Sequence, residues 1–167
     1  RLLERFGLYQ TPLRKGAIWV HAVSVGEAVA GLSLIEALAA RLPSQTFIIT
    51  TNTVTAAKLV NDWTTGANLT HLYQPLDHPA YVDRFLDASA PMAAIFMESD
   101  FWPNLIHRTA EQDIPVIFAS SQISDAAAAR WRRRPALAAA AFGSAELVLA
   151  ANDEQAGRLC NLGAPSD

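Results

Sequence analysis

The stretch that decides the fold is Ile18–Leu38, which reads IWVHAVSVGEAVAGLSLIEAL. Its first part, Ile18–Val23, is a short apolar run with β-branched residues, typical of a strand buried on both faces. From Gly26 onward the apolar residues recur at helical spacing, which leaves Glu36 and Arg41 on the polar side. These apolar residues are Val29, Leu32, Leu34, Ile35 and Leu38. The pattern predicts a strand, a tight turn and a helix.

The predicted turn carries the residues Ser24, Gly26 and Glu27 at the carboxyl end of the strand, where open α/β sheets bind ligands. Gly26 allows close approach of another group to the backbone. Ser24 and Glu27 also have the spacing of a capping box, so Glu27 has a structural interpretation beside a chemical one. Its place in the first helical turn leads us to expect an ionised carboxylate at neutral pH. The turn lacks the lysine of a phosphate-binding loop, and the chain has no GxGxxG.

Composition limits the class of protein. The 167 residues are 51% hydrophobic and 17% charged with a net charge of −3, which fits one globular domain and gives no footprint for nucleic acid. Cys160 is expected to be a core thiol, and His21 is expected to be a hydrogen-bonded core histidine. The other histidines show no metal-ligand spacing.

Because the chain starts at Arg1 without methionine, we interpret it as a piece of a longer protein. Residues 1–16 form a leader, either a short helix against the domain or the foot of a membrane-proximal segment, and residues 17–167 form the domain.

Five further strands are expected to alternate with helices. They lie at residues 46–51, 69–73, 91–97, 114–119 and 147–150. This alternation predicts a doubly wound parallel sheet of the Rossmann-like class with right-handed crossovers, and the common strand order is 3-2-1-4-5-6.

The helix boundaries follow from capping residues. Thr53 is expected to cap the helix after the second strand, and Asp77 the helix that begins at Pro79. Asn152 and Gln155 have the spacing of a capping box for the closing helix. One alanine-rich helix is expected between the polar loop 120–124 and Phe142, broken or kinked at Pro135.

The predicted strand order places Glu27, Glu98 and Asp100 at one crevice, because the first and fourth strands are neighbours. Convergent carboxylates suit general-base work or the binding of hydroxyl groups. The structural alternative for Asp100 is a helix cap, and for Glu98 a solvated residue at a strand end.

Several motifs in order along the chain resemble the amino-terminal half of the Kdo transferases, which move 3-deoxy-D-manno-octulosonic acid (Kdo) from CMP-Kdo to the lipid A precursor. The motifs are HAVSVGE at 21–27, TTNT at 50–53, YQPLDHP at 73–79, ESDFWPN at 98–104 and RLCNLGA at 158–164. The resemblance implies an inverting glycosyltransferase of the GT-B type, with no metal and no cofactor. The acceptor lies on this domain, while CMP-Kdo binds mainly to a carboxyl-terminal domain absent from this chain. It also implies a place at the cytoplasmic face of the inner membrane.

The same resemblance assigns the residues of the site. Glu27 matches the family's catalytic base. The residues expected to contact the acceptor are Ser24, Gly26, Glu98, Asp100, Asn104 and Gln122. Gln122 occupies a position where the family usually has arginine, and Ala56 one where it usually has glycine. These departures keep a second hypothesis open, a non-catalytic α/β binding or interaction module. A nucleotide-binding Rossmann domain is disfavoured by the absent glycine fingerprint.

A basic cluster follows the fifth strand. It consists of Arg130, Arg132, Arg133 and Arg134. The cluster is a candidate for contact with lipid phosphates or an anionic membrane surface. The alternative is a solvated helix face.

Overall fold

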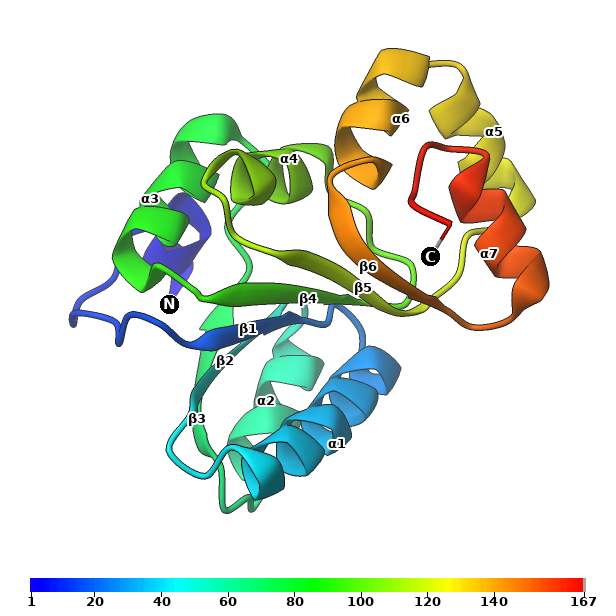
Figure 1. The fold of residues 1–167 in the computed structure, drawn as a ribbon. Coiled ribbons are helices and arrows are strands. Elements are labelled where there is room, and N and C mark those ends of the chain that lie inside the picture. Colours follow the sequence, from blue (N-terminus) through cyan, green and yellow to red (C-terminus); the bar gives the residue numbers. More distant parts are fainter. Residues whose placement is uncertain (167) are drawn as a thin grey trace.

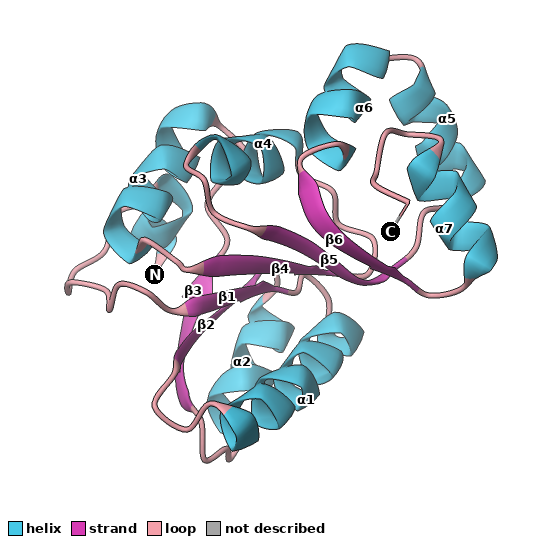
Figure 2. Cartoon of the chain, viewed as in Figure 1, coloured by secondary structure: helices cyan, strands magenta, loops and turns pink. Residues whose placement is uncertain are grey.

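The chain folds around a parallel β-sheet that has helices on both faces (Figures 1 and 2). The structure is a computed structural model and describes residues 1–166. The strands are β1 Ile18–His21, β2 Thr46–Thr51, β3 Asn68–Tyr73, β4 Ala93–Met97, β5 Val116–Ser121 and β6 Ala145–Ala150. Their order is β3-β2-β1-β4-β5-β6 and every neighbouring pair is parallel. The predicted fold class and strand order are therefore confirmed.

The helices divide between the two faces of the sheet. They are η1 Leu2–Phe6, α1 Val25–Arg41, α2 Val54–Asp62, α3 Pro79–Ser89, α4 Pro103–Glu111, α5 Asp125–Arg132, α6 Pro135–Phe142 and α7 Asp153–Cys160. In Figure 1, α1 and α2 lie below the sheet, and α3, α4 and α6 lie above it. None of the helices in residues 1–166 has the length and apolar character that a membrane span requires.

The central strand β1 shows how the sequence builds both core layers. Trp19 faces α3 and α4, where its ring packs against Phe85 and Phe96 with centroids 4.7 and 5.2 Å apart. Val20 belongs to the cluster on the α1 side. There α1 passes so close that a Cβ on Gly31 would lie 3.2 Å from Val20 Cγ1. Successive side chains of this buried strand thus point to opposite faces of the sheet and pack against the helices on each face.

His21 is the hydrogen-bonded core histidine that the sequence predicts. It is buried, and its Nδ1 lies 2.8 Å from Thr50 Oγ1, which also accepts a hydrogen bond from Trp19 Nε1. Burial lowers the pKa of His21 to about 3, so the ring is neutral. The histidine therefore holds β1 to β2.

The leader contains a short 3₁₀ helix, η1, that contacts α3 and the edge strand β3. Arg1 donates to the His71 carbonyl at 2.5 Å, and Glu4 accepts the Tyr73 N–H at 2.9 Å. Arg5 bonds the Asn52 side chain and carbonyl at the end of β2. The leader therefore occupies polar backbone groups of the edge strand, which would otherwise be open to pairing.

Two helix boundaries differ from the prediction. Asp77 does not cap α3, whose N-cap His78 makes no side-chain capping bond. Asp77 instead accepts from the backbone of α4, at Leu105 N (2.8 Å) and Asn104 N (3.3 Å). Gln155 is not half of a reciprocal capping box, because its Oε1 accepts from Ile123 N at 2.6 Å. In both cases the side chain bonds a group distant in sequence instead of the helix end next to it.

The segment after β4 also departs from the prediction. The strand β5 extends to Ser121, which pairs with Ala150 across a register shift at Ser120, so these serines are not in a loop. The alanine-rich segment is broken at Pro135, as predicted, and forms two helices, because Arg134 is non-helical (φ −132°, ψ 65°) before Pro135. A proline ring disfavours the helical conformation in the residue that precedes it. Cys160 is half-buried rather than part of the core.

Candidate functional site

The turn after β1 forms the predicted capping box. Ser24 Oγ accepts from Glu27 N at 3.2 Å, and Glu27 Oε2 accepts from Ser24 N at 3.4 Å and Val23 N at 2.6 Å. Gly26 is exposed, and the nearest atom to a Cβ built there would be Ser24 Oγ at 3.9 Å. The backbone of the turn is therefore open to a ligand, while the Glu27 side chain is held firmly beneath it.

Glu27 lies in an environment that opposes its ionisation. The residue is only 6% exposed. Burial raises the pKa of its carboxyl group, hydrogen bonds from Val23 and Ser24 offset part of the rise, and the charges of Asp100 and Glu98 add to it. The amides at the helix amino terminus favour the carboxylate, as expected, but burial outweighs them, so the net shift of the pKa is upward. A raised pKa makes the carboxylate a stronger proton acceptor.

Asp100 joins this site rather than capping α4. The N-cap position of α4 is Trp102, and the first amides of that helix belong to Asp77. Asp100 Oδ2 is buried without a hydrogen bond of normal geometry among the described residues. Burial raises the pKa of Asp100, and the Trp102 indole on the same loop offsets part of that rise. A buried, unsatisfied carboxylate oxygen is costly in a purely structural role and is expected at a functional site.

Glu98 lies at a strained point of the backbone. Its φ of +53° is in the left-handed region, and Ser120 on the neighbouring strand has a φ of +52°. The two strand ends are joined, because Glu98 N donates to Ala119 O at 2.9 Å and Gln122 N donates to Glu98 O at 3.1 Å. Left-handed conformations of residues other than glycine cost energy and gather at functional sites. Glu98 is half-buried, so it is not the solvated strand-end residue of the structural alternative.

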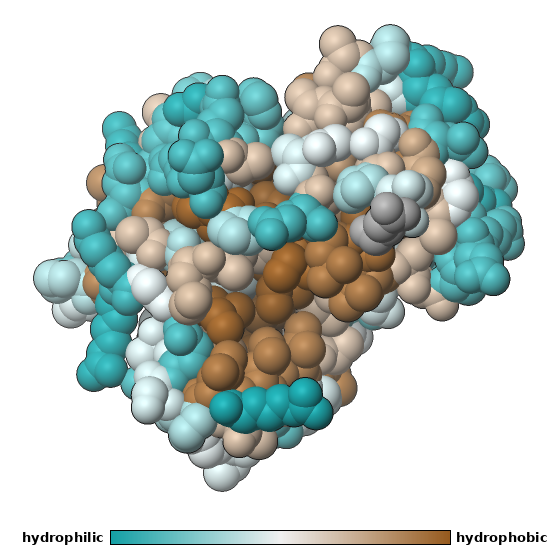
Figure 3. Space-filling view, in the orientation of Figure 1, coloured by the Kyte–Doolittle hydropathy of each residue, from teal (hydrophilic) through white to brown (hydrophobic). Residues whose placement is uncertain are grey.

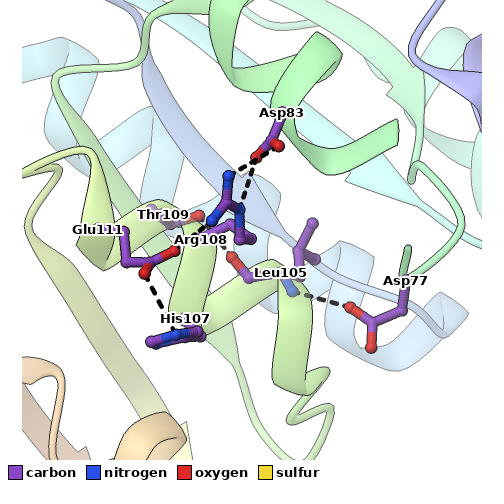
Figure 4. A network of polar contacts seen from close by, with 7 residues as sticks. All are labelled: Asp77, Asp83, Leu105, His107, Arg108, Thr109 and Glu111. Atoms are coloured by element: carbon purple, nitrogen blue, oxygen red, sulfur yellow. Dashed lines mark hydrogen bonds and ion pairs between the residues drawn. The ribbon is translucent and has the colours of Figure 1, made fainter. Parts of the chain in front are cut away.

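Asn104 is the predicted site residue that the structure uses elsewhere. Its Nδ2 donates to the Asp77 carbonyl at 3.0 Å and to Asp77 Oδ2 at 3.2 Å. Figure 4 shows the same junction of α3 and α4, where Arg108 donates to both carboxylate oxygens of Asp83 at 2.7 and 2.8 Å. These contacts fix the start of α4 and hence the loop that carries Glu98 and Asp100.

Gln122 lines a polar pocket of about 410 Å³ beside the ends of β4 and β5. The lining residues are Ser99, Gln122, Ile123, Ser124, Ala127, Arg130, Gln155 and Arg158. Arg158 reaches in from α7, donates to the Ile123 carbonyl at 3.0 Å and pairs with Asp125 and Glu154. Sequence reasoning missed Ser99, Gln155 and Arg158 as pocket residues. The available signal was the spacing of Gln155 and Arg158, three residues apart on one helix face.

Residues 1–166 contain no group of three or more histidine, cysteine, aspartate or glutamate side chains arranged to hold a metal ion. The geometry offers a buried carboxylate, two further acidic residues and an adjacent polar pocket. This set can accept a proton and bind hydroxyl groups.

Comparison with known proteins agrees with the motifs. Residues 1–167 match the family described as 3-deoxy-D-manno-octulosonic-acid transferase (kdotransferase). A 3-deoxy-D-manno-octulosonic acid transferase of Haemophilus influenzae is 34% identical over 170 residues, which covers all of this chain and 39% of that protein. The enzyme of the same name from Bordetella pertussis is 34% identical, over 88% of this chain and 35% of that protein.

A more distant organism has a similar protein. A probable mitochondrial 3-deoxy-D-manno-octulosonic acid transferase of Arabidopsis thaliana is 35% identical, over 77% of this chain and 29% of that protein. The chain thus spans less than half the length of these relatives, 39% in the Haemophilus influenzae enzyme. With a match that extends over its whole length, the chain belongs to the Kdo transferase family of glycosyltransferases and corresponds to the amino-terminal part of its members.

Proposed function

We propose that this domain binds the acceptor and supplies the general base in a GT-B type transferase that moves Kdo from CMP-Kdo to the lipid A precursor. Glu27 takes the proton from the acceptor hydroxyl as that oxygen attacks the anomeric carbon with inversion. Glu98, Asp100 and the Ser24–Gly26 turn position the acceptor.

The observation that carries this proposal is the environment of Glu27. The side chain is buried at the carboxyl edge of the sheet, and two further carboxylates act on its pKa. Such clustering of like charges reduces stability, and it is typical of sites that move protons. A helix cap alone would need neither Asp100 nor Glu98 nearby.

The proposal extends to partners and place. CMP-Kdo binds to the part of the relatives that lies outside this chain, and the acceptor reaches Glu27 from the cytoplasmic face of the inner membrane. The reaction uses neither a metal nor a cofactor, and no nucleic acid takes part.

The test is Glu27→Gln in a full-length transferase that contains this domain. Glutamine keeps an oxygen that can accept from Val23 N and Ser24 N, so the cap survives while proton acceptance is lost. We expect Kdo transfer to fall by about 10²–10⁴-fold, the usual worth of a positioned base. The free energy of unfolding should not fall.

Two controls separate the base from the cap. Ser24→Ala removes one capping bond and should cost about 0.5–2 kcal/mol of stability while most of the transfer rate remains. Glu146→Gln makes the same chemical change at an exposed position on β6 and should change nothing. Transfer at near the wild-type rate by Glu27→Gln would reduce Glu27 to a cap and favour a non-catalytic module or a base at Glu98 or Asp100.

A further inference from the structure

A second pocket, of about 430 Å³, lies where α4, α5 and α6 meet. It is lined by Pro103, Arg130, Trp131, Arg133, Arg134 and Leu137. Three of these six residues are arginines, and none of the six is acidic. The basic cluster is therefore not one uniform helix face, because Arg132 is not among the lining residues.

The arginines of the pocket lie at the junction of α5 and α6. Arg133 is the C-cap of α5, and Arg134 is the N-cap of α6, which has no side-chain capping bond. Their amides close a tight turn, from Arg133 N to Arg130 O (3.3 Å) and from Arg134 N to Trp131 O (2.8 Å). Arg133 and Arg134 follow Arg130 by three and four residues, the spacing that places side chains on one helix face, whereas Arg132 follows it by two.

The positive charge of this pocket is not neutralised within residues 1–166. Arg130, Arg133 and Arg134 are exposed, and the structure gives their guanidinium groups no ion pair with the described residues. Arg108 and Arg158, by contrast, each pair with two carboxylates. Unpaired guanidinium groups that surround one hollow match the bidentate geometry of a phosphate.

The other lining residues of the pocket are apolar. Trp131 packs edge-on against the buried Phe142 ring with centroids 5.0 Å apart, which fixes the indole at the pocket wall. Leu137 is 36% exposed and Pro103 completes the wall. Inorganic phosphate has no apolar part to bury against such a surface. A phosphate that carries an apolar chain can bury that chain there.

We propose that this pocket binds the phosphate of an anionic lipid, with the arginines on the phosphate and the lipid chain against Trp131 and Leu137. Arg130 also lines the polar pocket beside Glu98 and Gln122, so the two pockets share a wall. A lipid held here would present its headgroup toward the carboxylate crevice. That last step rests on the proposed function, whereas the binding itself does not.

Binding can be measured on the chain without any transfer reaction. The probes are dihexanoyl phosphatidic acid as a dissolved monomer, dihexanoyl phosphatidylcholine with the same chains, and inorganic phosphate. The readout is the indole N–H resonance of Trp131, assigned by its loss in Trp131→Phe. We expect phosphatidic acid to shift this resonance and to bind at least about tenfold more tightly than either other probe, which is ~1.4 kcal/mol.

Arg132 provides the matched control, because it carries the same charge at the neighbouring position, the last residue of α5, and does not line the pocket. Arg133→Ser together with Arg134→Ser should weaken binding of phosphatidic acid by tenfold or more, whereas Arg132→Ser should change it less than twofold. Leu137→Asn should weaken phosphatidic acid and leave the affinity for phosphate unchanged.

Three results would overturn the proposal. Equal loss per replaced arginine from Arg132→Ser and from the double variant Arg133→Ser with Arg134→Ser would show general surface attraction. Equal affinity for inorganic phosphate and phosphatidic acid would show a site for free phosphate. An unmoved Trp131 resonance with all three probes would show that the pocket binds none of them. Because no transfer is assayed, each outcome is independent of whether Glu27 acts as the base.

Discussion

Replacing Asp77 with alanine should destabilise the domain, although Asp77 lies in a loop and is only half-buried. Its Oδ1 accepts the Leu105 N–H at 2.8 Å, and its Oδ2 accepts the Asn104 N–H at 3.3 Å. These are amides of the first turn of α4, which Trp102 leaves without a side-chain cap. Loss of a side-chain cap costs about 0.5–2 kcal/mol. Because Asn104 Nδ2 also donates to the Asp77 carboxylate, the cost of Asp77→Ala should lie toward the upper end of that range.

Thermal unfolding followed by circular dichroism measures this loss. For a chain of this size, 1 kcal/mol lowers Tm by about 2–4 °C, so Asp77→Ala should lower Tm by ~2–8 °C. Amide hydrogen exchange shows where the stability is lost. The Leu105 N–H should lose its protection from exchange, while the α3 amide of Val82, which donates to the His78 carbonyl, should keep its protection. Asp87→Ala, at an exposed aspartate on α3, is the control. Unchanged Tm, or loss of protection in α3 instead of α4, would refute the assignment of Asp77 to α4.

Three further outcomes are expected. Because burial raises the pKa of Glu27, wild-type stability relative to Glu27→Gln should fall as the pH rises through that pKa, so urea unfolding at pH 4 and pH 7 should favour glutamine more at pH 7. A difference of the opposite sign would contradict the burial argument. The chain of residues 1–167 should unfold cooperatively by calorimetry yet transfer no Kdo from CMP-Kdo, and turnover near that of a full-length enzyme would refute the division of labour between domains. Leu149→Ser, at a side chain 53% exposed on the edge strand β6, should reduce self-association in sedimentation experiments, and no change would mean that this edge stays unpaired in solution.

The reason for the last expectation is visible in Figure 3, where apolar side chains gather on the face between α1 and β6. Exposed apolar residues on these elements include Leu147 and Leu149 on β6 and Val25 and Val29 on α1. The register pairs Leu147 with Ile117 and Leu149 with Ala119; Ala119 belongs to the core cluster on the α1 side, and the partly buried Ile117 packs against that cluster. That core therefore continues beyond the cover of its helices onto the edge of the sheet.

The architecture was predictable because it depends on rules that act on whole elements. Buried strands of apolar residues that alternate with amphipathic helices allow few topologies, and right-handed crossovers select among them. Once β1 and β4 are neighbours, Glu27 and the Glu98–Asp100 loop must share one edge of the sheet. The convergence of these acidic residues thus follows from topology, without knowledge of any side-chain contact.

The side-chain partners were less predictable, because they depend on distances across the fold. Asp77 was assigned to the helix next to it in sequence, but it bonds a helix 27 and 28 residues further along. Gln155 likewise bonds Ile123, 32 residues away. A local motif states which bonds a residue is able to make, and tertiary packing decides which of them form.

The two interpretations of Glu27 that the sequence left open are compatible in the structure. Both backbone amides that bond the side chain, Val23 N and Ser24 N, donate to the same oxygen, Oε2. Among residues 1–166 the structure gives no hydrogen bond to Oε1. The capping box therefore occupies one oxygen and holds the carboxylate in a fixed orientation, which leaves Oε1 for the proton transfer that we propose. For the general base that we propose, a carboxylate fixed in this way would lose little freedom in the reaction, so the cap is compatible with that role.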